Sequence, residues 1–160
     1  MFYKRAYVLA CDSYTSGGLR PELVPGEIIL TDGAFNDTAV ARLYGYDYDI
    51  IHSSKDLTNE IESMITSAEI PYKRGIHWTT DAGYRETWGQ VMDYRDKGAL
   101  CVEMEGVGLF TIANYRKCVA TGIYVVSDVY SENDWKLGWE GNDIKRAVGA
   151  VIDMIIESIR

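Results

Sequence analysis

The chain has 160 residues, of which 47% are hydrophobic and 25% charged, and this composition excludes an intrinsically disordered protein. The formal net charge of −8 argues against nucleic acid or an anionic membrane as a partner, because both would be repelled. This length allows one domain with a substantial core, so we expect a single domain over residues 1–160.

The cysteines and the length of the apolar runs bear on the cellular compartment. Cys11, Cys101 and Cys118 lie mostly inside apolar runs, which indicates buried thiols in a reducing compartment. The apolar stretch after Lys4 and Arg5 is much shorter than the hydrophobic region of a signal peptide, and no run is long enough to span a bilayer. We therefore expect a cytoplasmic protein.

Apolar runs broken by small or polar residues predict the first strands. Residues 6–11 and 27–31 are strand candidates, and Asp32-Gly33 is expected to close the second one. Between them, a turn is expected over residues 12–18. Its small residues would let a ligand approach the backbone, and its hydroxyl and N–H groups could bind an oxyanion such as phosphate. Such a stretch is more often simply a turn.

Helices and a strand are predicted in the middle of the chain. Residues 54–70 have the apolar spacing of an amphipathic helix. Residues 72–78 predict a strand, and residues 88–95 predict a second helix after a polar loop. The two histidines, His52 and His77, are too few and too isolated to predict a metal site, and we expect both to be structural.

Two apolar runs in the second half of the chain each lead to carboxylates. Residues 100–102 precede Glu103 and Glu105 at the start of a segment with helical spacing, and residues 119–126 end abruptly in Ser127-Asp128. Because ligands bind at the carboxyl ends of strands in α/β sheets, these carboxylates are expected to meet at one site. A plainer interpretation is that Glu103 and Glu105 are first-turn acids stabilised by the helix dipole.

The last part of the chain is expected to contain a flap and a helix. Residues 129–141 include Trp135 and Trp139 among polar residues, which is typical of a flap over a pocket. Residues 142–160 have apolar positions at helical spacing and predict a long amphipathic helix.

Several segments, taken in order, resemble the nucleoside phosphorylase superfamily, which contains purine nucleoside phosphorylases, uridine phosphorylases and related nucleosidases. They are Thr15-Ser16-Gly17-Gly18-Leu19 with residues 25–29, residues 78–87, Val102-Glu103-Met104-Glu105, and Val125-Val126-Ser127-Asp128. The resemblance implies an α/β fold with a central mixed β-sheet flanked by helices, in a chain that lacks the family's N-terminal part.

The resemblance also implies a role for each candidate residue. Asp128 would be the catalytic general acid toward the leaving base. The remaining roles are ribose binding by Glu105, Met104 and Glu103, phosphate binding by Thr15, Ser16 and Gly17, and base binding by Tyr84, Gly83 and Ser127. Phosphate is implied as the co-substrate, with no metal and no other cofactor. Relatives form dimers or hexamers, so a homo-oligomer is expected.

The residue types suit the cleavage of an N-glycosidic bond. Its transition state carries positive charge on the sugar and negative charge on the departing base. An ionised carboxylate such as Glu105 can accept hydrogen bonds from two adjacent ribose hydroxyls, and Met104 can pack against the sugar. The ring of Tyr84 can stack on a flat heterocycle.

Three positions depart from the family pattern. Asp12 stands where the family has an arginine, three residues before Thr15, and an acid there would repel phosphate. Lys136 is the only basic residue between Asp128 and Lys145, where relatives often have an arginine. Gly83 replaces an aromatic residue of many relatives, which leaves the base preference open.

Several functions therefore remain open. The first is phosphorolysis of a purine nucleoside to free base and ribose 1-phosphate. The second is a truncated, non-catalytic relative that keeps the fold and can bind nucleoside, and the third is a nucleosidase-type hydrolase. A flavodoxin-like binding or signalling domain would require the matching segments to be coincidental.

Overall fold

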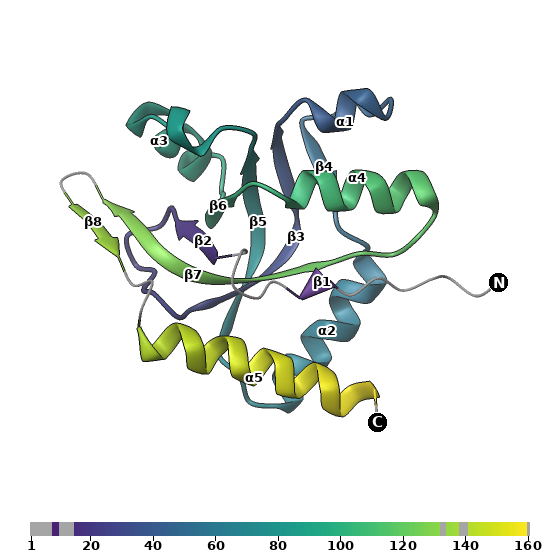
Figure 1. Ribbon diagram of the computed structural model, residues 1–160, viewed down its shortest axis with the longest axis vertical. Helices are drawn as coiled ribbons and strands as arrows, with labels where there is room; N and C mark the ends of the chain where they lie inside the picture. The colour runs from purple at the N-terminus through teal and green to yellow at the C-terminus, as the bar shows by residue number, and fades with distance from the viewer. Residues whose placement is uncertain (1–7, 10–14, 132–133, 138–140, 160) are drawn as a thin grey trace.

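The computed structural model describes residues 8–9, 15–131, 134–137 and 141–159. Eight strands form one mixed β-sheet, and helices pack around it (Figure 1). This confirms the fold class implied by the sequence. Within the described ranges, no helix combines the length and the apolar character needed to cross a bilayer.

The secondary-structure elements have the following bounds. The strands are β1 (Val8–Leu9), β2 (Thr15–Gly18), β3 (Ile28–Asp37), β4 (Ile50–His52), β5 (Tyr72–Thr80), β6 (Cys101–Glu103), β7 (Gly122–Ser131) and β8 (Asp134–Leu137). The helices are α1 (Val40–Leu43), α2 (Lys55–Ser67), α3 (Trp88–Asp96), α4 (Gly106–Arg116) and α5 (Asn142–Ile159), and a 3₁₀ turn, η1 (Gly83–Arg85), precedes α3.

Strand β7 closes the sheet on itself. The strand order is β1-β7-β2-β6-β5-β3-β4, and β7 also pairs with β3, so that β7, β2, β6, β5 and β3 form a ring. The β3–β5, β5–β6 and β2–β7 pairs are parallel, whereas β2–β6 and β3–β7 are antiparallel. Because a ring has no free edges, the backbone groups of these strands find partners within the fold. Figure 1 shows β7 as the long curved strand across the molecule.

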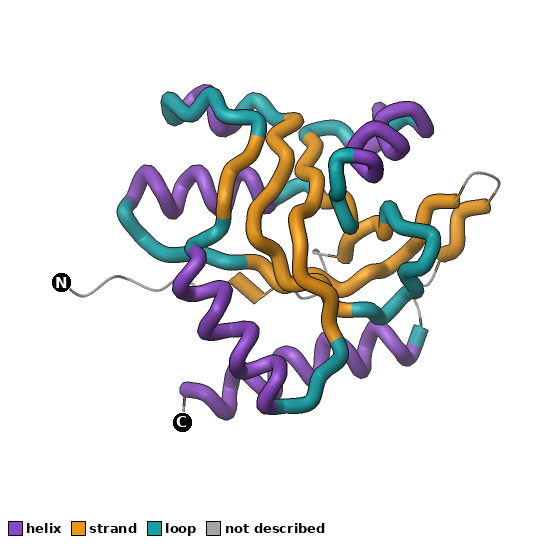
Figure 2. The backbone as a smooth tube through the Cα atoms, turned by 180° about the vertical axis from the view of Figure 1, so that it is seen from behind, coloured by secondary structure: helices purple, strands orange, loops and turns teal. Residues whose placement is uncertain are grey.

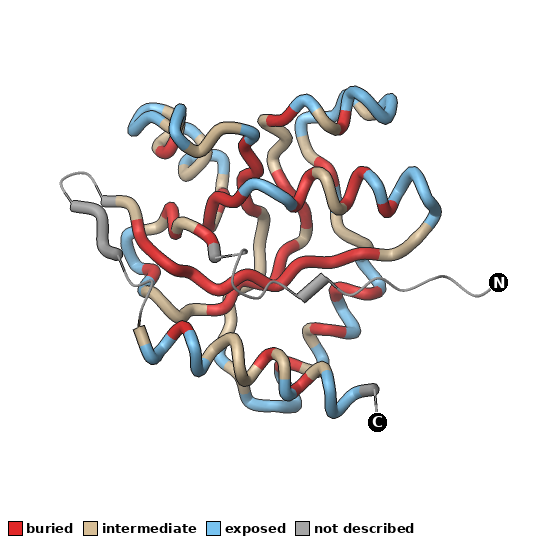
Figure 3. The backbone as a smooth tube through the Cα atoms, viewed as in Figure 1, coloured by how far each residue is buried: buried red, intermediate tan, exposed pale blue. Residues whose placement is uncertain are grey.

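Helices cover the ring from two ends. In Figures 1 and 2, α2 and α5 lie toward the lower end, and α1, α3 and α4 lie toward the upper end. The core between α2, α5, β3 and β7 consists of Ile28, Leu30, Leu57, Ile61, Ile65, Ile123, Val125, Ile144, Val151 and Met154. These buried positions confirm the apolar stripes predicted for both amphipathic helices. Figure 3 shows that burial is nearly continuous along β7 up to Val129.

Strand β3 is longer than predicted, because Asp32-Gly33 does not end it. The strand continues to Asp37, and its register against β5 shifts between Thr31 and Gly33, which marks a bulge. Gly33 has a φ of +153°, and a Cβ there would lie 2.8 Å from the carbonyl oxygen of Ile51. Glycine therefore lets the strand pass β4 at this point, and the prediction of a strand end is wrong.

Strand β7 also runs beyond its predicted end. It continues past Asp128 to Ser131 and pairs there with β8. Opposite it on β2, Ser16 pairs with Val126 and Gly17 pairs with Asp128, so Ser127 is an extra residue in a bulge. The prediction that a strand ends at Ser127-Asp128 is wrong, because the polar pair sits in this bulge.

The predicted flap is in part a β-hairpin. Residues 129–131 belong to β7, and β8 pairs back on it antiparallel, with Val129 opposite Lys136. Trp139 lies outside the described residues. The described part of residues 129–141 is therefore a hairpin, and its role as a flap over a pocket stays a prediction.

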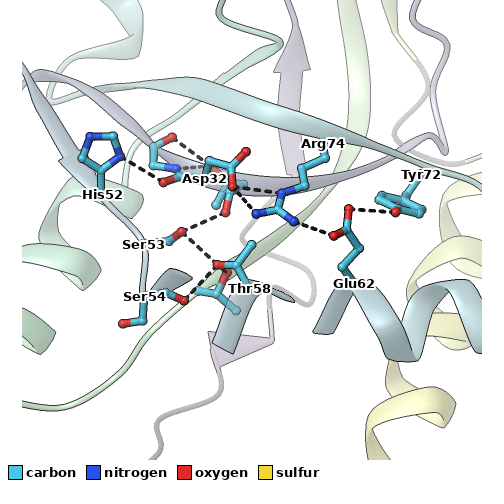
Figure 4. A network of polar contacts seen from close by, with 11 residues as sticks. Asp32, His52, Ser53, Ser54, Thr58, Glu62, Tyr72 and Arg74 are labelled. Carbon is cyan, nitrogen blue, oxygen red and sulfur yellow. Dashed lines mark hydrogen bonds and ion pairs between the residues drawn. The ribbon is translucent and has the colours of Figure 1, made fainter. Parts of the chain in front are cut away.

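A network of polar contacts attaches α2 to the sheet (Figure 4). Arg74 on β5 donates from Nε and Nη2 to Oδ1 of Asp32 at 2.9 and 2.7 Å, and from Nη1 to Oε2 of Glu62 at 2.5 Å. Tyr72 donates to the other oxygen of Glu62 at 3.0 Å. The guanidinium is half-buried and bridges two elements, so it contributes more than a solvated surface pair would.

We expect Arg74→Met to lower the free energy of unfolding by about 1–2 kcal/mol, because it removes charge-assisted hydrogen bonds while keeping much of the side-chain volume. Arg146→Met, which removes an exposed pair with Asp143 within α5, should cost less than about 0.5 kcal/mol. Urea unfolding of both variants measures the difference. Equal losses would contradict the stronger role of Arg74.

Candidate functional site

A cavity of about 400 Å³ lies where β6 leads into α4. The junction contributes Met104, Glu105 and Gly106 to its wall, and other wall residues come from the start of β7. Val40 and Asp81 complete part of the opposite side. The structure therefore brings two of the predicted ribose-binding residues, Met104 and Glu105, to one cavity.

Glu103 lies behind this wall and is buried, with 5% of its surface exposed. Its Oε2 accepts hydrogen bonds from the backbone N–H groups of Glu105 and Gly106 at 2.9 and 2.7 Å, and its Oε1 accepts from Thr79 Oγ1 at 2.5 Å. Its carboxylate thus caps the first turn of α4. The plainer interpretation, in which Glu103 and Glu105 are first-turn acids, is wrong, because Glu103 ends β6, Glu105 is the N-cap residue, and the first turn of α4 contains no acid.

His77 is the residue whose place in the site the sequence did not indicate. Its ring is fully buried on β5, and its Nε2 lies 3.0 Å from Oε1 of Glu103. Its Nδ1 lies 2.6 Å from Oγ1 of Thr31. His77 and Thr79 alternate along β5 and therefore share one face, which was the available sequence signal. The contact between His77 and Glu103 joins β5 to β6, and such a contact leaves no pattern in either segment of the sequence.

The surroundings shift the pKa values of Glu103 and Glu105 in opposite directions. Burial by itself raises the pKa of Glu103, but the hydrogen bond from His77, the charge of His77 and the bonds from Thr79 and the backbone outweigh it and leave the pKa below its usual value. The pKa of Glu105 is raised, first by burial and then by the charge of Glu103. Glu103 is therefore held ionised, whereas Glu105 binds a proton more readily than an ordinary glutamate.

Glu105 itself is the N-cap residue of α4, but its side chain does not cap the helix. Its Oε2 accepts a hydrogen bond from the backbone N–H of Met104 at 3.2 Å. Both side chains are exposed at the cavity. Their position leaves them available to a ligand.

Asp128 and Ser127 are buried in the β7 bulge. The hydroxyl of Ser127 donates to Oδ1 of Asp128 at 2.5 Å. Nearby, Tyr130 donates to Oε2 of Glu86 at 3.0 Å. The pKa of Glu86 is raised by burial and by the charge of Asp128, against the lowering effect of that hydrogen bond. Glu86, which the sequence did not single out, therefore lies close enough to Asp128 for the two carboxyl groups to interact electrostatically.

The predicted phosphate-binding residues belong to β2, so the expectation of a turn over residues 15–18 is wrong. Parallel pairing with β7 holds this stretch extended, with Gly17 opposite Asp128. Gly17 packs against the ring of Tyr130, since a Cβ at Gly17 would lie 2.6 Å from that ring. Thr15, Ser16 and Gly17 therefore run beside Ser127 and Asp128. Asp12 lies outside the described residues.

Two of the predicted base-binding residues, Gly83 and Tyr84, occupy the turn η1, whereas the third, Ser127, lies in β7. A Cβ on Gly83 would lie 3.7 Å from Sδ of Met104, so this turn borders the ribose candidates. The side chain of Tyr84 is fully exposed and is not among the residues that line the cavity.

No group of three or more His, Cys, Asp or Glu side chains suited to a metal ion occurs among the residues that the structure describes. Histidine 52 is exposed on β4 and histidine 77 contacts Glu103.

Comparisons with known proteins give a consistent result. The family model described as "Phosphorylase superfamily" matches residues 14–157. The chain is 31% identical over 116 residues to a purine nucleoside phosphorylase DeoD-type of Exiguobacterium sibiricum, covering 71% of this chain and 49% of the relative. Over 146 residues it is 23% identical to the DeoD-type enzyme of Buchnera aphidicola, covering 91% of this chain and 61% of the relative.

Solved structures share the fold. The crystal structure of purine nucleoside phosphorylase from Toxoplasma gondii in complex with immucillin-H matches with a TM-score of 0.79 and 18% identity, covering 90% of this chain and 59% of that one. The P. knowlesi homologue of P. falciparum PNP matches with a TM-score of 0.74 and 21% identity, covering 90% and 57%. The chain thus spans about half the length of curated relatives such as the Exiguobacterium enzymes.

We expect Gly106→Ala to destabilise the protein by about 2 kcal/mol or more, because the added Cβ would lie 2.4 Å from Nε2 of His77 and 2.8 Å from Oη of Tyr124. Gly108→Ala, two residues further along α4, is the matched control. Its Cβ would meet nothing closer than Val40 at 4.0 Å, so stability should stay the same or rise. Thermal and urea unfolding test both, and equal stability of the two variants would refute the close packing at Gly106.

Proposed function

This chain belongs to the phosphorylase superfamily, and on that basis we propose that it catalyses phosphorolysis of a purine nucleoside to free base and ribose 1-phosphate. The observation that carries the proposal is the Glu105 carboxylate beside Met104 at a cavity of about 400 Å³. That volume lies in the range of small-molecule sites. The purine class is supported by the relatives, which are purine nucleoside phosphorylases.

The ribose would bind at the β6–α4 junction. The ionised carboxylate of Glu105 accepts from two adjacent hydroxyls of the sugar, and Met104 packs against the sugar ring. Glu103, which the sequence also suggested for ribose binding, is buried and accepts hydrogen bonds from Thr79, His77 and the start of α4. We therefore assign Glu103 a positioning role behind the ribose site.

Asp128 would protonate the leaving base. A phosphate oxygen forms a bond to the anomeric carbon while the bond from that carbon to the base nitrogen breaks, and the bonding pair goes to the base. A proton from Asp128 to the purine N7 neutralises that charge. Ser127, which donates to Oδ1 of Asp128, orients the carboxyl group, and Tyr84 with Gly83 would border the base after the exposed ring turns inward.

Phosphate would bind along β2 as the co-substrate. Thr15, Ser16 and Gly17 lie next to Asp128 through the β2–β7 pairing, so an anion bound there would be near the proposed general acid. Asp12 precedes Thr15 by three residues in the sequence, and an acid at that position opposes anion binding. Because Asp12 disfavours phosphate binding, the experiment must also distinguish two other outcomes, namely hydrolysis by water and nucleoside binding without turnover.

A homo-oligomer is also proposed, as the resemblance implies. Exposed apolar side chains gather on α1 and α4, namely Leu43, Tyr44, Ile112 and Tyr115. The rings of Tyr44 and Tyr115 meet edge to face with centroids 5.1 Å apart. Such a patch is typical of a surface that another protein covers, and a second copy of the chain is the partner that the family suggests.

For catalysis, we expect release of hypoxanthine from inosine only when phosphate is present. Asp128→Asn should slow release by about 100-fold or more, because the proton donor is lost. Glu105→Gln should weaken inosine binding by about tenfold or more and leave hypoxanthine binding unchanged, because the base does not touch this group. Glu157→Gln, an exposed change on α5, is the control and should have no effect.

Each other result would count against phosphorolysis. Release of hypoxanthine and free ribose without phosphate would identify a hydrolase. Inosine binding without any release would identify a binding protein that keeps only the sugar and base half of the site.

For assembly, analytical ultracentrifugation should detect a dimer or larger species at micromolar concentration. Leu43→Glu combined with Tyr115→Glu should dissociate it, because burying two carboxylates in an apolar contact is costly. Val24→Glu, at a separate exposed apolar position, is the matched control. A monomeric wild-type chain would refute the proposal.

A further inference from the structure

His77 and Glu103 form a buried pair directly behind the wall of the cavity. The Nε2 of His77 lies 3.0 Å from Glu103 Oε1 and 3.4 Å from Thr79 Oγ1, and its Nδ1 lies 2.6 Å from Thr31 Oγ1. We propose that His77 is a positioning residue: its Nε2–H fixes Glu103, and through Glu103 it fixes the start of α4 so that Glu105 can bind the ribose. The binding of ribose by Glu105 rests on the proposed function, whereas the link from His77 to Glu105 does not.

The carboxylate of Glu103 determines the role of one ring nitrogen of His77. Glu103 Oε1 belongs to an ionised carboxylate and can only accept, so Nε2 of His77 donates to it. On the other side of the ring, Nδ1 contacts Thr31 Oγ1, which is itself held by the carbonyl oxygen and the N–H of Gly33 at 2.8 and 3.1 Å. Both sides of the imidazole are therefore fixed.

The groups that face His77 come from the neighbouring strands and from α4. Glu103 faces it from β6, and the ring of Tyr124 on β7 lies with its centroid 4.7 Å away. Burial raises the pKa of Tyr124 well above its usual value, so its hydroxyl stays neutral. Phe110 on α4 presents an apolar edge. The buried carboxylate of Glu103 would be strongly destabilising without its donors, so its position depends on His77.

The connection to Glu105 runs through the backbone of α4. An N-cap residue usually uses its own side chain to accept from the first N–H groups of its helix. Here Glu103 accepts from the N–H groups of Glu105 and Gly106, and the side chain of Glu105 makes no capping bond. Because Glu103 does the capping, the carboxylate of Glu105 remains free to face the cavity.

The helix start is held tightly against His77. Gly106 leaves no room for a side chain, since a Cβ there would lie 2.4 Å from Nε2 of His77 and 3.0 Å from Oε1 of Glu103. A shift of the imidazole or of the Glu103 carboxylate therefore moves the backbone that carries Glu105. A residue that only stabilised the core would lack this direct contact.

The first test compares binding of inosine and of hypoxanthine by calorimetry. His77→Leu should weaken inosine binding at least tenfold and change hypoxanthine binding less than twofold, because only the nucleoside contains the ribose. His77→Gln, which keeps an N–H donor toward Glu103, should restore part of the loss, and it replaces the leucine variant if that variant does not fold. His52→Gln, at the exposed histidine, should change neither affinity.

A double-mutant cycle tests the pathway. The losses of inosine affinity in His77→Leu and Glu105→Gln should combine to less than their sum, because His77 acts through Glu105. Equal weakening of inosine and hypoxanthine, or losses that add fully, would overturn the proposal and leave His77 a structural residue.

Amide hydrogen exchange tests the link without any ligand. In His77→Leu or His77→Gln, the amides of Glu105 and Gly106 should lose protection at least tenfold, while the amide of Val151 in α5 keeps its protection. Unchanged protection at Glu105 and Gly106 would overturn the proposal. If the wild-type chain binds no inosine, the proposed function fails, and the exchange result still decides whether His77 positions Glu105.

Discussion

The buried carboxylate of Glu103 is the constraint on which the site depends. It ends β6, caps α4, pairs with His77 and accepts from Thr79 on β5. Each of these contacts replaces hydration that the carboxylate lost on burial, so the surrounding elements must stay in register to satisfy it. The consequence is a fixed strand-to-helix junction, and the next acid in the chain, Glu105, is carried on that junction to the cavity.

Closure of the sheet sets the shape of the other half of the site. β7 must pair with β2 and with β3, and two bulges accompany that closure, one at Gly33 and one at Ser127. The bulge at Ser127 places two successive polar residues in the core, where the serine hydroxyl donates to Asp128. The same irregularity that helps to curve the strand thus forms the environment of the proposed general acid.

The proposed ribose site and the surroundings of the proposed general acid, Asp128, differ in how accessible they are to a ligand. The β6–α4 junction already holds Glu105 and Met104 at a cavity. Asp128 is buried beside β2, with Glu86 and Tyr130 as neighbours, and the ring of Tyr84 is turned to solvent. In the proposed function, the ring of Tyr84 would therefore have to turn inward to border the base.

The sequence by itself predicted the longer helices and singled out most residues of the proposed site. The 3.6-residue period defined α2 and α5 because one face of each helix is buried, and apolar runs leading to acids singled out Glu103, Glu105 and Asp128. Only the tertiary structure decided where β3 and β7 end and which glutamate lies at the cavity. Strand ends depend on the partner strand, and the roles of Glu103 and His77 depend on a contact between β5 and β6. Contacts between strands that are distant in the sequence leave no trace in local periodicity.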